Sequence, residues 1–152
     1  MAGALFGKAG RNLSVKEARE KAAQCLELTA MMDKRYFPVS KLTVPDRKRL
    51  ELARSLATDP TLLLLDEVMA GLRPIEIDDA LELIKTINEK MNITILFIEH
   101  VMRAVMSISQ RIIVLNTGQK IAEGSPKEIS ENPQVIEAYL GRKYMERRGT
   151  DG

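Results

Sequence analysis

The sequence predicts an α/β fold with a mainly parallel sheet and flanking helices. Two short apolar segments carry this prediction: Leu62–Leu65, which follows a proline, and Ile93–Ile98, further along the chain. Each of them follows a segment in which apolar residues recur at helical spacing. The order helix, strand, helix, strand indicates right-handed crossovers and therefore parallel strands. Because the apolar residues are consecutive, we expect both strands to be buried on both faces.

The composition limits the class of protein. The chain has 152 residues, of which 45% are hydrophobic, enough for the core of one domain or of part of one. The formal net charge is only +2, which argues against nucleic acid as an obligatory partner. Cys25 is the only cysteine, so a disulfide framework is excluded and a reducing cytosol is the natural compartment. We expect no signal peptide and no membrane-spanning helix.

Capping signals predict where the helices begin. Ser14 with Glu17 forms a capping box, and the helix after it has one apolar side: Ala18, Ala22, Cys25, Leu26 and Thr29. Thr43 can cap a second helix, in which Pro45 is tolerated in the first turn. Its core-facing residues are Leu50, Ala53, Leu56 and Ala57, and its basic flank is of the kind that is usually solvated.

The rest of the chain continues in the same way. A helix with apolar positions at 77, 80, 81, 84, 87 and 91 ends at Asn92, a plausible C-cap. Later segments predict a short helix over Met102–Ile108 and a hairpin over 111–123. A capping box at Ser125 and a last helix, Pro133–Leu140, precede a polar tail from residue 142 to 152.

Polar residues follow both apolar strands. Asp66 and Glu67 come directly after the first strand, and Glu99 and His100 after the second. Because the carboxyl ends of parallel strands open on one edge, we expect Asp66, Glu67 and His100 to come together there. Two readings stay open for the acids: ordinary solvated residues at a strand end, or ligands for Mg²⁺ and an activated water. A lone histidine is usually structural, but its position beside two acids favours function.

Five segments in order resemble the second half of an ABC transporter ATPase, with its signature motif, Walker B motif, D-loop and switch histidine. They are Leu42–Asp46, Arg49–Ala57, Leu62–Glu67, Ala70–Leu72 and Ile98–His100. The segments Gly118–Ser125 and Asn132–Gly141 are similar to the ATP-binding subunits of branched-chain amino acid importers. The resemblance covers nearly the whole chain from about Leu5.

The resemblance implies a fold and a division of the chain. It implies a partial P-loop NTPase fold of the ABC ATPase type, with part of the helical signature subdomain over residues 1–60. The C-terminal part of the RecA-like ATPase core would occupy residues 61–141, and the tail residues 142–152.

The resemblance also implies roles for individual residues in an ATPase that uses ATP and Mg²⁺. Asp66 would hold Mg²⁺ through water, Glu67 would be the general base, and His100 would hydrogen-bond the γ-phosphate and the water. Gly71 and Leu72 would lie in the loop that crosses a dimer interface. The residues that would cover the ATP of the opposite subunit are Leu42, Thr43, Val44, Pro45 and Asp46.

By the same resemblance, the partners would be a second ATPase subunit, identical or different, and the transmembrane permease subunits. The protein would lie in the cytoplasm, peripheral at the inner face of the cell membrane.

The sequence departs from the family pattern in two respects. It contains no G-x-x-x-x-G-K-[ST] phosphate loop and no upstream glutamine loop, so we expect a fragment or the product of a truncated gene. Val44 and Pro45 stand where the family usually has two glycines, and Asp46 where glutamine is common. Proline has no amide hydrogen to donate, and Asp46 adds negative charge near a polyphosphate. Both changes weaken the expected contact with ATP.

Two functions of different classes therefore remain. One is an ATP-hydrolysing importer subunit, here without its phosphate-loop half and so inactive as this chain alone. The alternative is a non-catalytic ABC module that acts through protein–protein interaction. A soluble ABC-type ATPase acting on DNA or ribosomes is disfavoured by the modest charge and by the lack of a tandem second domain.

Overall fold

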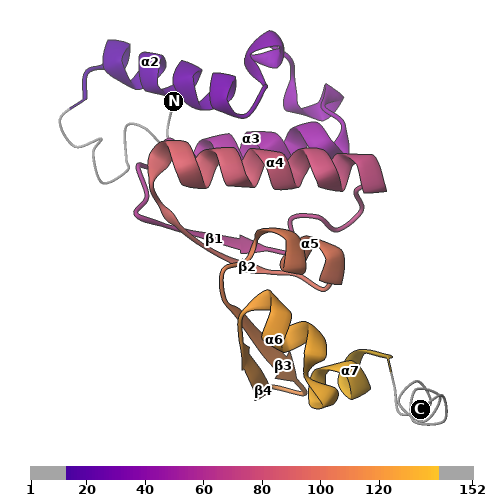
Figure 1. The fold of residues 1–152 in the computed structure, drawn as a ribbon. Helices are drawn as coiled ribbons and strands as arrows, with labels where there is room; N and C mark the ends of the chain where they lie inside the picture. Colours follow the sequence, from indigo (N-terminus) through magenta and orange to yellow (C-terminus); the bar gives the residue numbers. More distant parts are fainter. Residues whose placement is uncertain (1–12, 141–152) are drawn as a thin grey trace. The chain divides into compact units, whose positions relative to one another are not determined.

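A computed structural model describes residues 13–140, which fall into two compact units (Figure 1). The first unit ends at Glu99 and the second begins at His100. Each is described here by itself. The expected start of the resemblance near Leu5 and the predicted tail, residues 142–152, lie outside the described residues.

The helices of the first unit begin where the capping signals predict. Helix α2 (Val15–Leu28) has the expected box, in which Ser14 Oγ accepts from the Glu17 amide and Glu17 accepts from the Ser14 amide. Ala18 and Cys25 on its apolar side are buried. Two short 3₁₀ helices, η2 (Met32–Lys34) and η3 (Val39–Lys41), lead to α3 (Val44–Leu56). Most of the predicted core positions of α3 and of α4 (Pro74–Met91) are buried, Leu56 and Ile87 fully, whereas Leu50, Ala80 and Met91 are only partly buried.

Strands β1 (Leu62–Asp66) and β2 (Thr94–Ile98) pair in parallel, as predicted, and Asp66 lies opposite Ile98 in the register. Helices α3 and α4 lie on the same side of this sheet (Figure 1). Leu63 and Leu65, which alternate with exposed neighbours along β1, are buried. The predicted parallel pairing is therefore confirmed, with α4 in the connection between the two strands.

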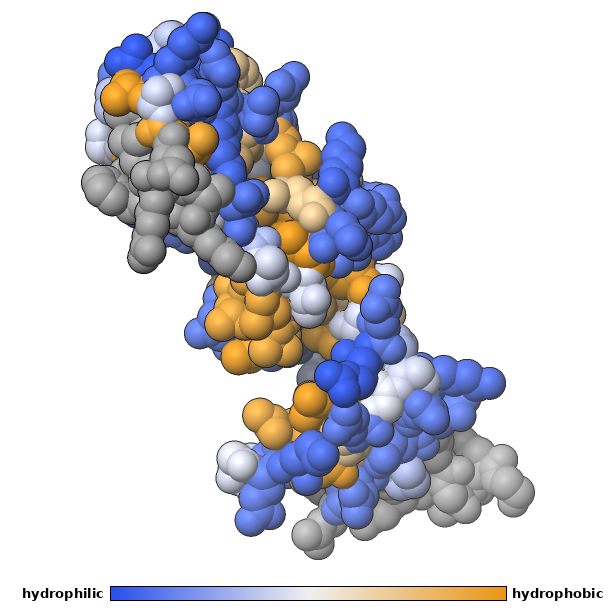
Figure 2. Space-filling view, turned by 90° about the vertical axis from the view of Figure 1, so that its left-hand side faces the viewer, coloured by the Kyte–Doolittle hydropathy of each residue, from blue (hydrophilic) through white to orange (hydrophobic). Residues whose placement is uncertain are grey.

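The prediction that both faces of these strands are buried is wrong. Leu64 is 65% exposed and Ile98 62% exposed, because no described residue of this unit packs closely over that side of the strands. Figure 2 shows hydrophobic side chains gathered at the surface in the middle of the view. We call the four exposed apolar residues of the two strands the open sheet face: Leu62, Leu64, Leu96 and Ile98.

The second unit contains helix α5 (Met102–Ile108), an antiparallel pair and two further helices. The predicted hairpin is formed by β3 (Ile112–Asn116) and β4 (Gln119–Gly124), joined by Thr117 and Gly118, both with positive φ. Such a pair of residues suits the twist of a two-residue hairpin. Helices α6 (Pro126–Glu131) and α7 (Pro133–Leu140) follow. Ile112, Ile129 and Val135 form a buried apolar cluster in this unit.

No helix among residues 13–140 is both long enough and apolar enough to cross a membrane.

Candidate functional site

The carboxyl end of β1 presents Asp66 and Glu67, both exposed. Asp66 is the last residue of the strand, and the Glu67 amide donates to the Ile98 carbonyl at 2.9 Å, which extends the ladder between β1 and β2 by one bond. Because this bond fixes the Glu67 backbone, the two carboxylates leave the sheet from a defined edge. This is the edge where the sequence predicts a ligand site.

A turn directly follows the strand. Glu67 has a φ of +45°, in the left-handed region that disfavours residues with a Cβ atom. The turn closes through two backbone bonds, from the Ala70 amide to the Glu67 carbonyl at 3.1 Å and from the Leu72 amide to the Met69 carbonyl at 3.2 Å. Gly71, with a φ of +77°, adopts the conformation that glycine tolerates best. The segment that the resemblance assigns to the dimer-crossing loop is therefore a defined turn.

Glu99 holds this turn from the end of β2. Its Oε1 accepts a hydrogen bond from the Met69 amide at 2.8 Å, and the Met69 side chain is 2% exposed. A hydrogen bond to a carboxylate stabilises by about 1.5–3 kcal/mol, comparable to the cost of about 1–2 kcal/mol for one left-handed residue. Glu99 was not among the predicted site residues. Its position directly after a strand, one residue before His100, is the signal that could have identified it.

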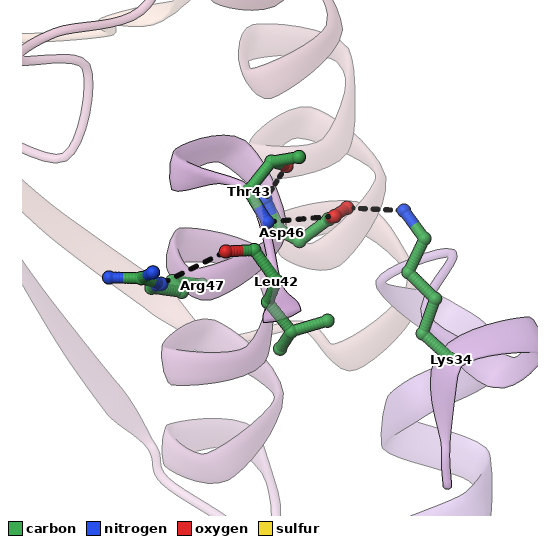
Figure 3. Close-up of polar contacts among 5 residues, drawn as sticks. All are labelled: Lys34, Leu42, Thr43, Asp46 and Arg47. Carbon is green, nitrogen blue, oxygen red and sulfur yellow. Dashed lines mark hydrogen bonds and ion pairs between the residues drawn. The ribbon is translucent and has the colours of Figure 1, made fainter. Parts of the chain in front are cut away.

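The start of α3 is organised around Thr43 and Asp46 (Figure 3). Thr43 Oγ1 accepts from the Asp46 amide at 3.3 Å, and Asp46 Oδ2 accepts from the Thr43 amide at 3.3 Å, which completes a capping box. The Arg47 Nε donates to the carbonyl of buried Leu42 at 3.1 Å. These contacts fix the segment that the resemblance places over a nucleotide.

Asp46 also has a cationic partner. Lys34 of η2 donates from Nζ to Asp46 Oδ1 at 2.6 Å (Figure 3). This bond is the main reason why the pKa of the Asp46 carboxyl lies below its ordinary value. The bonds with Thr43 lower the pKa as well. The expectation that Asp46 simply adds negative charge here needs correction, because the Lys34 ammonium offsets that charge. The two partners are twelve positions apart, a pairing that sequence spacing alone does not indicate.

The other two residues of the predicted nucleotide-covering segment occupy the first turn of α3. Val44 is half exposed and Pro45 is partly buried. Pro45 at this position has no amide hydrogen, as the sequence predicts.

Helix α3 also contacts the turn after β1. Lys48 Nζ donates to the Glu67 carbonyl at 3.5 Å. Lys48 belongs to the basic flank of α3, which was expected from the sequence to be solvated, but its ammonium group contacts the backbone of Glu67. A groove of about 290 Å³ lies beside this contact, lined by residues of α3, β1 and α4. Its walls include both basic and acidic side chains, Lys48 and Arg49 against Glu76 and Asp79.

The described residues supply carboxylates for a metal but not a complete cage. No three His, Cys, Asp or Glu side chains within residues 13–140 cluster in a way that could hold an ion. Mg²⁺ is commonly bound by one or two carboxylates together with substrate phosphates and waters, and Asp66 at the exposed strand end fits that donor set. The binding of Mg²⁺ by Asp66 stays a prediction.

His100 is the first residue of the second unit. The prediction that it joins Asp66 and Glu67 in one site stays a prediction. Gly71 and Leu72 lie in the turn described above, and their place at a dimer interface likewise stays a prediction.

Comparison with known proteins shows what this architecture resembles. Residues 119–144 match the family described as branched-chain amino acid ATP-binding cassette transporter. The chain is 43% identical over 137 residues to the high-affinity branched-chain amino acid transport ATP-binding protein BraF of Pseudomonas aeruginosa, covering 90% of this chain and 54% of that protein. It is 46% identical over 125 residues to LivG of Escherichia coli, a protein with the same description, covering 82% of this chain and 49% of that protein.

Solved structures agree in fold. The ADP conformation of MJ1267, an ATP-binding cassette of an ABC transporter, matches with a TM-score of 0.76 at 30% identity. That match covers 86% of this chain and 52% of MJ1267. A nucleotide-free ATP-binding cassette from an ABC transporter matches with a TM-score of 0.72 at 28% identity, over 91% of this chain and 55% of that one.

The predicted fold class, a partial ABC ATPase fold, is thereby confirmed. The chain has a partial ABC ATPase fold and is similar in sequence to the ATP-binding proteins of branched-chain amino acid ABC transporters, and it spans about half the length of the relatives that it matches.

Proposed function

We propose that this chain is the signature and Walker B portion of an ATP-hydrolysing subunit that drives import of branched-chain amino acids. The observation that carries the proposal is the turn after β1. It holds Asp66 and Glu67 at the carboxyl end of a parallel strand, with the start of α3 linked to the same turn through Lys48. The descriptions of BraF and LivG, which name branched-chain amino acid transport, support the substrate class.

The roles follow from the chemistry of phosphoryl transfer, which depends on positioning and on charge stabilisation. Asp66 would hold Mg²⁺ through water, and the bound ion would neutralise charge that develops on the phosphates. Glu67 would accept the proton of the attacking water, since a carboxylate adjacent to the metal ligand can reach it. His100 would donate a hydrogen bond to the γ-phosphate.

The start of α3 would cover the ATP held by a second ATPase subunit. The Thr43 hydroxyl and the positive end of the helix dipole are the donors available there. Because Asp46 is paired with Lys34, its charge is offset before any phosphate arrives. Gly71 and Leu72 would lie at the interface between the two subunits, and the pair would work beneath permease subunits at the inner face of the membrane.

A second candidate is a non-catalytic ABC module that acts through protein–protein interaction. Two observations favour it: the open sheet face, and Pro45 at a position where a donating amide would be useful to a phosphate.

Nucleotide binding separates the two candidates. We expect the chain alone to bind Mg-ATP weakly and to hydrolyse none, because the sequence has no phosphate loop to supply the main contacts to the β- and γ-phosphates. We expect the chain joined to a segment that carries a phosphate loop, called here the joined cassette, to bind Mg-ATP and hydrolyse it.

Calorimetric titration and a phosphate-release assay measure both quantities. A dissociation constant in the low micromolar range for the chain alone contradicts the first expectation. A joined cassette that binds ATP but never releases phosphate favours the non-catalytic module.

A further inference from the structure

Two consecutive residues at the end of β2 hold the turn after β1. The Ile98 carbonyl accepts from the Glu67 amide at 2.9 Å, and Glu99 Oε1 accepts from the Met69 amide at 2.8 Å. The turn is therefore fixed to the end of β2 at two points, and one of them depends on a side chain. Of these two points, only the second can be removed by substitution without altering the backbone ladder.

The turn needs such support because of its backbone conformation. Glu67 has a left-handed φ of +45°, which costs energy for any residue with a Cβ atom. Without a fixed Met69 amide, the peptide groups between the two residues are free to relax toward right-handed conformations. The direction in which the Glu67 side chain leaves the strand would then change as well.

The second carboxylate oxygen of Glu99 indicates that this residue is not there for stability alone. Oε2 is buried and accepts no hydrogen bond from any residue that the structure describes. A buried carboxylate oxygen without a donor is costly, and an apolar residue would avoid that cost. A carboxylate is, however, the stronger acceptor for a backbone amide. Glutamate at this position therefore gives a stronger hydrogen bond to the Met69 amide at the cost of an unsatisfied buried oxygen.

We propose that Glu99 is a positioning residue: by holding the Met69 amide it keeps the turn from Glu67 to Leu72 in shape and so directs the Glu67 carboxylate. The inference rests on the proposed function, because it concerns how the proposed general base is aimed. It assigns to Glu99 no contact with ATP or Mg²⁺.

Amide hydrogen exchange on the full chain, followed by NMR, tests the hold directly. Glu99→Leu removes the acceptor, and we expect the Met69 amide to exchange about tenfold faster or more, with a shift of the Glu67 and Ala70 amide signals. Glu99→Gln keeps one carbonyl oxygen, and we expect it to restore most of the protection. Glu89→Gln, at an exposed position on α4, is the matched control and should change none of these amides.

Two outcomes of this experiment overturn the proposal. In one, Glu99→Leu leaves the exchange of Met69 unchanged. In the other, it accelerates the amides of α2 and α4 as much as that of Met69, which means that Glu99 only stabilises the unit as a whole.

The joined cassette supplies the second measurement. We expect Glu99→Leu to lower kcat about tenfold with the KM for ATP little changed, and Glu99→Gln to recover most of the rate. If kcat is unchanged in Glu99→Leu, the proposal that Glu99 directs the Glu67 carboxylate is refuted. If the unsubstituted joined cassette releases no phosphate, the proposed function fails, while the exchange measurement still decides whether Glu99 holds the turn.

Discussion

The Asp46–Lys34 pair should stabilise the start of α3 by a measurable amount. Asp46 Oδ1 accepts from Lys34 Nζ at 2.6 Å and Oδ2 from the Thr43 amide at 3.3 Å. The Asp46 side chain is 13% exposed and that of Lys34 31%, so solvent screens the pair only in part. Replacing Asp46 by alanine removes both contacts at once.

The expected magnitude follows from these two contacts. Loss of half of a capping box costs about 1 kcal/mol. A surface ion pair is worth about 0.2–1 kcal/mol, and partial burial places this one toward the upper end of that range. We therefore expect Asp46→Ala to lower the free energy of unfolding by about 2 kcal/mol and Lys34→Met by about 1 kcal/mol.

Urea unfolding of the two single variants and the double variant provides the coupling energy between the two side chains. We expect a coupling energy of about 1 kcal/mol at neutral pH. Glu17→Ala is the matched control, since within residues 13–140 no lysine or arginine pairs with the Glu17 carboxylate of this capping box. Its loss should be smaller than that of Asp46→Ala. A coupling energy of zero at neutral pH refutes the reasoning.

The pH dependence has a definite sign. The folded-state pKa of Asp46 lies below its ordinary value of 3.8, mainly because of the bond from Lys34. The folded state therefore binds the proton less readily than the unfolded state, and the stabilisation is fully present above the ordinary pKa. It is lost as the pH falls through the lower, folded-state pKa. A coupling energy that instead weakens between neutral pH and pH of about 5 contradicts this assignment.

The remaining predictions concern the site and the exposed strands. In the joined cassette, Glu67→Gln should keep ATP binding and reduce turnover by roughly 10²-fold or more, because it removes the base. Asp66→Asn should weaken Mg-dependent binding, and His100→Ala should reduce turnover with little loss of affinity. Steady-state ATPase assays with parallel binding measurements check all three, and near-normal turnover in Glu67→Gln means that Glu67 is not the base. The chain alone should self-associate, because within the described residues the sheet has two strands, each with an unpaired edge, and an exposed apolar face. Light scattering coupled to gel filtration tests this: Leu64→Lys should shift the chain toward monomer, and a clean monomer at high concentration for the unsubstituted chain opposes the prediction.

The helices were predictable because the signals that begin and end them are local. Ser14, Thr43 and Ser125 each cap a helix through a residue three positions later, and the structure contains all three boxes. Asn92 closes α4 with a left-handed φ of +49°, as its residue type predicts. Interactions across three or four residues form within one segment, so the sequence indicates them without knowledge of what packs around the helix.

The contacts that define the site were less accessible because they join residues distant in sequence. Glu99 and Met69 are thirty positions apart, and Lys34 and Asp46 twelve.

The burial of the two strands was wrongly predicted for a related reason. An apolar run such as Leu62–Leu65 indicates that both faces of a strand can be buried, but whether they are buried depends on which other elements pack against them. Within the first unit, α3 and α4 lie on one face of the strands, and the apolar residues of the other face are exposed.

The backbone of Glu67 is held by contacts from other elements of the first unit. Its peptide group is held from three directions: the amide by the Ile98 carbonyl, and the carbonyl by the Ala70 amide and by Lys48. Only Ala70 is a sequence neighbour; Ile98 comes from β2 and Lys48 from α3. The two acids after β1 therefore depend, for the direction of their side chains, on the strand that carries Glu99 and on the helix capped by Thr43. A left-handed glutamate needs such outside support, since its own backbone preference opposes it. The backbone that carries the two acids is thus positioned by β2 and α3 as well as by its own turn.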